Sequence, residues 1–298
     1  MENIIIANPD LEDIKIKIAE DGANSLHLLT NFDNSLTKAF VNGEKIPSII
    51  SQIRNGKFLT KDYSKQAHDL YNKYHAIEID NKLKREEKIS YMQEWWRTHY
   101  NLLVELGLNK KDIQRVVKEG KVEFRKGFLD FLDLLKQNNI PMIVMSATGL
   151  GDAIELYFKK YNKFSENIHI ISNFFMFDNN GRVKSIKEPI IHSMNKHEII
   201  LKQHNPEVFK KIEKRKNVIL IGDRIEDIGM IQGFKYDNII KIGFLNENNP
   251  FKKGLTQNQD INKKFEEQLE VYKKTFDIII TGDGDFSFIN GLLREILK

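Results

Sequence analysis

Residues 26–36 read LHLLTNFDNSL and join an apolar run to a polar turn. The run, Leu26–Thr30, has the composition of a strand buried on both faces, as strands of a parallel sheet are. The turn carries an amide at Asn31 and a carboxylate at Asp33. Because ligands of open α/β sheets bind at the carboxyl ends of the strands, we expect the chemistry of the protein at this turn.

Later apolar runs have the same character, and each ends in a polar or glycine-containing turn. They are Pro141–Met145, Asn217–Ile221, Asn238–Gly243 and Phe276–Ile280. Amphipathic segments of helical length lie between them, for example Phe128–Gln137 and Asp152–Lys160. Strands that alternate with helices predict a doubly wound α/β fold with a parallel sheet.

The pattern changes between residues 40 and 125, where helix-like segments rich in Lys, Glu, Tyr and Trp replace the buried strands. A crossover of that length indicates an inserted domain rather than a loop. We therefore expect a core formed by residues 1–39 and 126–298, and a helical domain formed by residues 40–125.

A short antiparallel element is predicted beside the sheet. The sequence Asn179-Asn180-Gly181 is a hairpin-turn signal, and it separates residues 171–177 from residues 182–186. We expect this hairpin to project from the core.

The bulk composition is that of an ordinary globular protein. Of 298 residues 41% are hydrophobic, and 46 Lys and Arg against 42 Asp and Glu give a net charge of +4. This charge attracts anions mildly but is not the footprint of a nucleic-acid-binding protein. The chain has no cysteine, no signal-peptide pattern and no apolar run of membrane-spanning length. We expect a cytoplasmic monomer or weak dimer without a nucleic-acid polymer or a membrane as partner.

Other polar residues follow the predicted strands. Ser146 ends the second strand, Asp223 and Asp227 follow the third, and Lys196 lies between them in Asn195-Lys196-His197. Taken singly, Asp33 could be a helix N-cap, Ser146 a turn residue and Lys196 a surface charge. Asp223 is the strongest single candidate, because an acid at the end of a buried strand suits a metal site.

Together with the Asn31/Asp33 turn, these residues resemble the four motifs of the haloacid dehalogenase superfamily. More narrowly, from Leu26 onward the chain is similar to the cytosolic 5'-nucleotidase III (pyrimidine 5'-nucleotidase) family. Further matching segments are Glu78-Ile79-Asp80, Glu94-Trp95-Trp96, Ser146-Ala147 with Gly149-Leu150-Gly151-Asp152, Ile171-Ser172-Asn173-Phe174 and Phe177-Asp178. The resemblance implies a haloacid dehalogenase-like core with a helical cap. It also implies a Mg²⁺-dependent hydrolysis of nucleoside 5'-monophosphates through an aspartyl-phosphate.

The resemblance also assigns roles to the core residues. Asn31 stands at the position of the nucleophile and of one metal ligand. Asp33 would protonate the leaving oxygen and later activate water, while its backbone carbonyl binds the metal. Asp223 would be a Mg²⁺ ligand, and Asp227 would hold a metal-bound water or Lys196. Hard oxygen ligands of this kind suit Mg²⁺.

Two further groups would bind the phosphate. Ser146 and the amide of Ala147 would bind its oxygens, and Lys196 would neutralise charge between nucleophile and phosphate, as phosphoryl transfer requires.

In the cap, Glu94 resembles the carboxylate that accepts hydrogen bonds from the base. Trp95, Trp96 or Tyr100 would supply a stacking face, although the two tryptophans could equally form the small core of the cap. The Glu-Trp-Trp triplet occurs in family members that accept 7-methylguanosine monophosphate as well as pyrimidine nucleotides.

Four positions depart from the family pattern. The main one is Asn31. A neutral carboxamide is a poor nucleophile, and its presence in place of a carboxylate leaves the metal with one negative ligand fewer. Asn34 stands where an apolar residue is usual, and the extra Thr148 would displace the phosphate-binding amide. Arg224 replaces a small polar residue, where it would either hold a phosphate oxygen or simply be exposed.

Three explanations of Asn31 stay open: a deliberate substitution that traps substrate, a natural pseudoenzyme, or direct attack by water. Separately, three functions stay open: a 5'-nucleotidase that Asn31 impairs, a nucleotide-binding pseudoenzyme that acts as sensor or sink, and a phosphotransferase that passes the phosphoryl group to another nucleoside.

Overall fold

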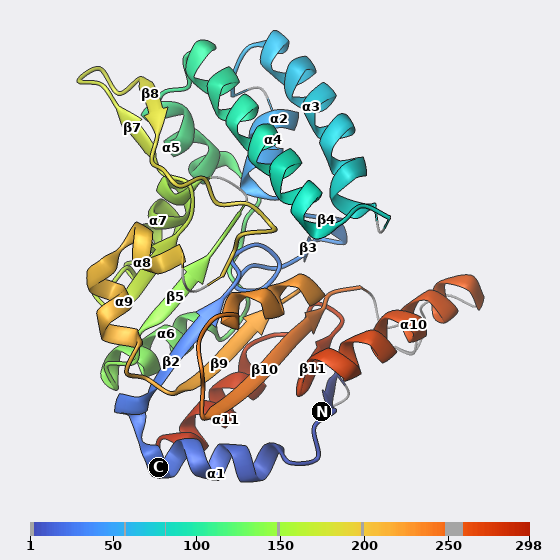
Figure 1. The fold of residues 1–298 in the computed structure, drawn as a ribbon, viewed down its shortest axis with the longest axis vertical. Coiled ribbons are helices and arrows are strands. Elements are labelled where there is room, and N and C mark those ends of the chain that lie inside the picture. The colour runs from blue at the N-terminus through green and yellow to red at the C-terminus, as the bar shows by residue number, and fades with distance from the viewer. Residues whose placement is uncertain (1–2, 57, 81, 148–149, 198–199, 248–258) are drawn as a thin grey trace.

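A seven-stranded sheet forms the centre of the core in the computed structural model, which describes residues 3–56, 58–80, 82–147, 150–197, 200–247 and 259–298 (Figure 1). Its strand order is β1-β11-β10-β9-β2-β5-β6. The strands are β1 (Ile4–Ile6), β2 (Leu26–Thr30), β5 (Met142–Met145), β6 (Ile168–Ile171), β9 (Asn217–Gly222), β10 (Asn238–Leu245) and β11 (Ile278–Thr281). All neighbours pair in parallel except β1, which runs antiparallel along β11. The predicted α/β fold with a parallel sheet is confirmed.

Two strands of this sheet were not predicted. β1 is only three residues long, too short to give a periodic signal. β6 ends at Ile171, and it contains the polar His169 in the middle of its four residues. The sequence pattern places its last residue, Ile171, in the predicted hairpin, since a short strand and a hairpin arm have the same composition.

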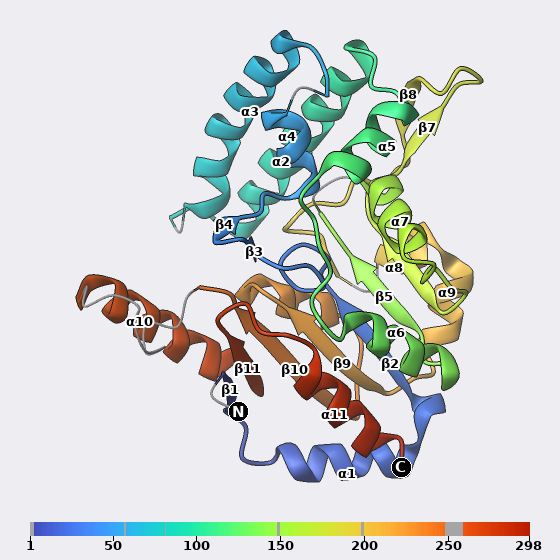
Figure 2. The ribbon, with the colours of Figure 1, turned by 180° about the vertical axis from the view of Figure 1, so that it is seen from behind.

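The alternation of side chains along each strand divides the core into two apolar layers. Leu28, Val144 and Ile219 pack on one face with the helices α1 (Leu11–Asp21), α6 (Phe128–Gln137), α7 (Gly151–Lys160) and α11 (Ser287–Ile296). Figure 2 shows α6 and α11 crossing this face. The strands are therefore buried on both sides, which explains their nearly continuous apolar sequence.

The opposite face of the sheet is covered by a second set of elements. Leu29 and Leu220 pack there with α8 (Ile200–His204), α9 (Pro206–Ile212) and the 3-10 segment η2 (Ile225–Ile231). α10 (Gln259–Thr275) packs on β10 and β11, where its Phe265 lies in one apolar cluster with Ile279 of β11.

Between β2 and α6 the chain forms a helical part that lies over the carboxyl ends of the strands (Figure 1). It contains β3 (Phe40–Val41), β4 (Glu44–Lys45), α2 (Ile49–Asn55), α3 (Lys61–Ile79), α4 (Arg85–Glu105) and α5 (Lys110–Glu119). α3 begins after Thr60, whose hydroxyl accepts a hydrogen bond from the Tyr63 amide at 3.3 Å. α5 begins at a capping box in which the Asp112 carboxylate accepts from the Asn109 amide at 3.0 Å.

The hairpin at Gly181 forms from β7 (Phe175–Phe177) and β8 (Val183–Ile186). It lies against the helical part rather than projecting alone. The Val183 amide donates to the Leu108 carbonyl at 2.9 Å, and the Lys110 amide donates to the Gly181 carbonyl at 2.8 Å. A segment from beyond residue 125 thus extends the surface formed by the helices.

The order of the strands determines where the site lies. From β2 the chain proceeds outward to β5 and β6, and then returns to build β9, β10 and β11 on the other side of β2. The carboxyl ends of β2, β5 and β9 therefore meet at the switch point of the sheet, where a ligand crevice is expected.

Burial at this central position predicts a stability effect. Ile219 is fully buried in β9, so Ile219→Ala should lower the free energy of unfolding by about 2 to 5 kcal/mol and Ile219→Val by about 1 kcal/mol. Urea unfolding at equilibrium measures both. Ile79 is 61% exposed, and Ile79→Ala should change the stability by less than about 0.5 kcal/mol. Equal effects at the two positions would contradict the assignment of Ile219 to the core.

Candidate functional site

The side chain of Asn31 lies at the centre of the polar cluster that follows β2 and β9. Its Nδ2 donates to the Asp33 backbone carbonyl and to Oδ1 of Asp223, both at 2.8 Å. Its Oδ1 accepts a hydrogen bond from Nζ of Lys196 at 2.9 Å. An ammonium group can only donate, so Lys196 requires the amide oxygen on its own side and directs the NH₂ group to the other two partners.

Lys196 and Asp227 form a buried ion pair beside Asn31. Lys196 Nζ lies 2.7 Å from Asp227 Oδ1, and the two side chains are 9% and 5% exposed. The other carboxylate oxygen of Asp227 accepts from the backbone amides of Asp223 and Arg224, at 3.0 and 3.1 Å. A Cβ on Gly222 would lie 2.6 Å from the Asp227 Cβ, so the close packing of Asp227 on the end of β9 requires glycine at this position.

Asp223 carries the second carboxylate at the end of β9. Its Oδ1 accepts from Asn31 and also from the Ser35 hydroxyl, at 3.0 Å. Burial, and then repulsion by Asp227, raises the pKa of Asp223 to about 6. The Tyr272 hydroxyl donates to the Asp223 backbone carbonyl. Hydrogen bonds therefore hold both the carboxylate and the backbone carbonyl of Asp223.

A cavity of about 1010 Å³ opens between this cluster and the helical part. Asn31, Asp33, Ala147, Lys196, Asp223, Arg224 and Asp227 line it from the core. From the helical part, the lining includes aromatic rings and charges, namely Tyr71, His75, Trp95, Trp96, His99, Arg54, Glu78, Arg85 and Lys88. A volume of this size is at the upper end of the range of small-ligand sites.

The aromatic wall of the cavity is a stack of rings on α4. The rings of Trp95 and Trp96 lie 5.5 Å apart at 22°, and Trp96 lies 5.9 Å from His99 at 14°. Burial, with a smaller effect of Arg54, lowers the pKa of His99 to about 3, so the ring is neutral at physiological pH. These rings therefore form an uncharged part of the cavity wall.

The predicted base-binding residues divide into two groups. Trp95 and Trp96 line the cavity, whereas Glu94 and Tyr100 are not among the described residues that line it. The Glu94 side chain is 55% exposed and accepts a hydrogen bond from the Tyr74 hydroxyl at 2.7 Å. One residue along a helix turns the side chain by about 100°, which separates Glu94 from the face of Trp95. Tyr100 is buried behind Trp96, at 5.5 Å.

The predicted phosphate-binding residues are also divided. Ala147 and Lys196 line the cavity. Ser146 is fully buried at the end of β5, and its amide donates to the Ile171 carbonyl at 3.0 Å. Thr148 and Gly149, which carry the departure from the family pattern, lie outside the described residues. Arg224 is exposed and lines the cavity.

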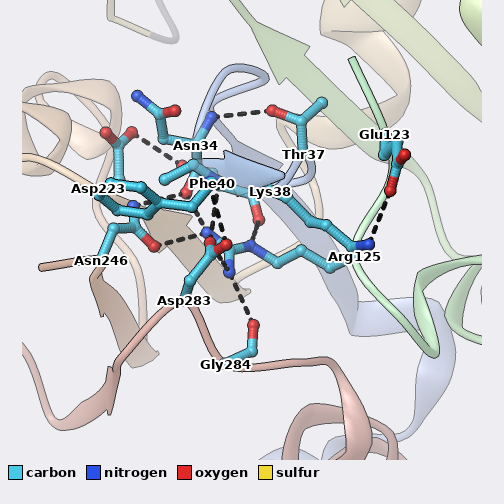
Figure 3. A network of polar contacts seen from close by, with 12 residues as sticks. Asn34, Thr37, Lys38, Phe40, Glu123, Arg125, Asp223, Asn246, Asp283 and Gly284 are labelled. Atoms are coloured by element: carbon cyan, nitrogen blue, oxygen red, sulfur yellow. Dashed lines mark hydrogen bonds and ion pairs between the residues drawn. The ribbon is translucent and has the colours of Figure 1, made fainter. Parts of the chain in front are cut away.

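A buried arginine that the sequence did not single out supports the turn from behind. Figure 3 shows Arg125 between this turn and the loops after β10 and β11. Its guanidinium donates to the backbone carbonyls of Asn34 and Ser35 and to the side chains of Asn246 and Asp283. The ion pair with Asp283 measures 2.8 Å, and the Arg125 side chain is 1% exposed.

One signal in the sequence could have pointed to this network. Asp283 follows the buried strand β11 in the way that Asp223 follows β9. Arg125 itself stands in no motif, and four of its acceptors come from residues more than 80 positions away. Only the folded chain brings these groups together.

The comparisons with known proteins are consistent with this geometry. The profile described as "Pyrimidine 5'-nucleotidase (UMPH-1)" matches residues 34–297. The chain belongs to this family. The 7-methylguanosine phosphate-specific 5'-nucleotidases of Mus musculus and Homo sapiens are 34% and 33% identical, over 96% of this chain and 90% of theirs.

Solved structures extend the comparison. A cytosolic 5'-nucleotidase IIIB bound to cytidine matches this member of the pyrimidine 5'-nucleotidase family with a TM-score of 0.84 and 26% identity, covering 99% of this chain and 94% of that one. A HAD-family hydrolase from Salmonella enterica shares the fold, with a TM-score of 0.53, 14% identity, and coverage of 90% and 71%. The haloacid dehalogenase-like fold and the family resemblance are confirmed.

The Mg²⁺ ion that the fold family implies does not fit the donor set of this chain as it stands. Mg²⁺ binds oxygen lone pairs, but both N–H groups of Asn31 point at two of the three oxygens predicted to bind it, those of Asp33 and Asp223. Among the described residues no group of three or more acidic or histidine side chains is arranged to hold a metal ion.

No helix in the described ranges is long and apolar enough to cross a membrane.

The raised pKa of Asp223 predicts a pH-dependent stability. The folded chain binds a proton on Asp223 more tightly than the unfolded chain does. Protonation of Asp223 therefore stabilises the fold fully below about pH 4, and this stabilisation is lost as the pH rises through about 6. Between pH 4 and 7, the free energy of unfolding of Asp223→Asn should rise by about 1 to 2 kcal/mol relative to that of wild type. Urea unfolding across this range measures the difference, and a difference independent of pH would contradict it.

The Arg125 network predicts a second stability effect. Arg125→Met leaves Asp283 and the carbonyls of the turn without their donor, and should lower the free energy of unfolding by about 3 to 5 kcal/mol. Arg125→Lys keeps the charge but can donate to fewer acceptors, so its loss of free energy of unfolding should be intermediate. The neighbouring Lys126 is exposed, and Lys126→Met should cost less than about 0.5 kcal/mol. Chemical denaturation distinguishes the three variants; equal stability of Arg125→Met and Lys126→Met would refute the role of the network.

Proposed function

We propose that this chain binds nucleoside 5'-monophosphates in the cavity between core and helical part, and that Asn31 blocks their hydrolysis. The chain belongs to a family of 5'-nucleotidases, and a relative of 26% identity binds cytidine. The observation that carries the proposal is the hydrogen bonding of Asn31 to Lys196, Asp33 and Asp223. The position of the nucleophile is filled by a neutral group with fixed partners.

The phosphate is proposed to lie at the core side of the cavity, against Lys196, the amide of Ala147 and Arg224. Lys196 and Arg224 line the cavity together with Ala147, and cations and amide donors at one end suit an anion. Ser146 would act through the end of β5, since its side chain is buried. Asp33, which is 8% exposed, would face the oxygen that joins phosphate and nucleoside.

The nucleoside is proposed to extend from the phosphate towards residues 40–125, which we propose act as a cap. A base would stack on Trp95 and Trp96, whose flat faces suit any nucleobase. On the side of the helical part, the described lining residues include the carboxylate of Glu78, which accepts from the Ser193 hydroxyl at 2.6 Å. We propose Glu78 rather than Glu94 as the acidic neighbour of the base.

The chemistry of Asn31 explains the block. In an active member the nucleophile is a carboxylate that attacks phosphorus, forms an acyl phosphate and releases the nucleoside. The Asn31 amide has no negative charge, and its oxygen is already hydrogen-bonded to Lys196. A phosphotransferase would need the same acyl phosphate, so the substitution disfavours that alternative equally. Binding without turnover, as in a nucleotide sensor or sink, is the function that the site supports best.

We base the proposed cellular location on the relatives. One solved relative is named as cytosolic, and we propose that this chain also works in the cytoplasm, as a monomer or weak dimer.

The proposal predicts that one substitution restores turnover. With Mg²⁺ and cytidine, uridine or 7-methylguanosine 5'-monophosphate, Asn31→Asp should release phosphate at least about a thousandfold faster than wild type, because it regains the nucleophile. A phosphate-release assay measures turnover, and isothermal titration calorimetry measures binding to both proteins.

Asn55→Asp is the matched control, because Asn55 lines the same cavity from α2 and is exposed. It adds the same carboxylate without restoring the nucleophile, so phosphate release should not rise. Wild-type turnover within tenfold of Asn31→Asp would refute the block, and failure of every protein to bind any of these nucleotides would refute the proposed ligand.

A further inference from the structure

The hydrogen bonds of Asn31 bear on the cation requirement of the site. A carboxylate has two acceptor oxygens, so at this position it could face Lys196 with one and a cation with the other. A carboxamide has one acceptor end and one donor end. Here the acceptor end faces Lys196 Nζ at 2.9 Å, and only the donor end remains for the side of Asp33 and Asp223.

The NH₂ group of Asn31 does at short range what a cation would do. It bridges the Asp33 carbonyl and the Asp223 carboxylate with two hydrogen bonds of 2.8 Å, one from each N–H. The Ser35 hydroxyl donates to the same Asp223 oxygen at 3.0 Å. The two oxygens that converge at this point therefore already have donors.

Rotating the amide to admit a cation is opposed by Lys196. The rotation would place the NH₂ group against the ammonium, at the 2.9 Å separation now occupied by a hydrogen bond. Two donors at that distance repel each other. Lys196 cannot move away easily, because its ion pair with Asp227 is almost fully buried and measures 2.7 Å.

We propose that the amide of Asn31 takes the structural place of the divalent cation, so that this site binds the phosphate of a nucleotide without Mg²⁺. The inference rests on the proposed function for its ligand, but the exclusion of the metal depends on Asn31, Lys196 and Asp223 alone. The positive charge for the phosphate comes from protein side chains. Lys196 uses two of its three N–H groups on described partners, and we expect the third to donate to a phosphate oxygen.

The exclusion of Mg²⁺ is tested first without nucleotide. Thermal unfolding is followed while MgCl₂ is raised to 10 mM at constant ionic strength, for wild type, Asn31→Asp and the control Asn55→Asp. Wild type and Asn55→Asp should show no rise in Tm. Asn31→Asp should be less stable without metal, because it adds a carboxylate beside Asp223, and its Tm should rise by about 3 °C or more with Mg²⁺. A comparable rise in wild type would overturn the proposal.

The binding of phosphate is then measured with inorganic phosphate and with cytidine 5'-monophosphate as probes, in EDTA and in Mg²⁺. The Kd of wild type should change by less than about twofold between the two conditions. The Kd of Asn31→Asp should weaken by about tenfold or more in EDTA, since its two carboxylates then repel the phosphate. Wild-type binding that appears only with Mg²⁺ would overturn the inference.

The two proposals fail in different ways. If wild type binds neither probe in EDTA or in Mg²⁺ while its Tm is unaffected by Mg²⁺, the proposed ligand is wrong and the exclusion of the metal stands. If wild type binds nucleotide but needs Mg²⁺, the proposed function stands and the role of the amide is wrong.

Discussion

The hydrogen bond from Lys196 to Asn31 is the interaction on which the character of this site depends. An ammonium group has no lone pair, so its partner must present an oxygen. In a symmetric carboxylate this requirement leaves a second oxygen available. In the amide of Asn31 it leaves only hydrogens, and these are bonded to Asp33 and Asp223. A change of one atom group thus alters nucleophilicity, net charge and metal preference together.

This interaction is possible because the fold holds both partners firmly. Asn31 follows β2 at the switch point of the sheet, and Lys196 is fixed by its buried pair with Asp227, whose other oxygen binds two backbone amides. Behind the turn, Arg125 binds the carbonyls of Asn34 and Ser35 (Figure 3). The polar cluster is therefore rigid on the core side, while the opposite wall of the cavity is built from aromatic rings on α4.

Much of this arrangement could be predicted from the sequence, because it depends on local patterns. The apolar run Leu26–Thr30 and the acid at Asp223 identify strand ends, and strand ends of a parallel sheet converge. The face of a helix is harder to predict, since a shift of one residue separates Glu94 from the cavity that Trp95 lines. Arg125 could not be predicted, because its partners are backbone carbonyls and side chains distant in the sequence. The orientation of the Asn31 amide follows only from the three groups around it, whose proximity is a property of the fold.

The position of a divalent cation tests most directly whether the Asn31 amide excludes the metal. Crystals of the chain and of Asn31→Asp, grown with cytidine 5'-monophosphate and soaked in Mn²⁺, would be compared by anomalous scattering. We expect a strong anomalous peak between residues 31, 33 and 223 in the Asp variant and no peak there in the wild type, with nucleotide bound in both. An equally occupied Mn²⁺ site beside Asn31 in the wild type would contradict it.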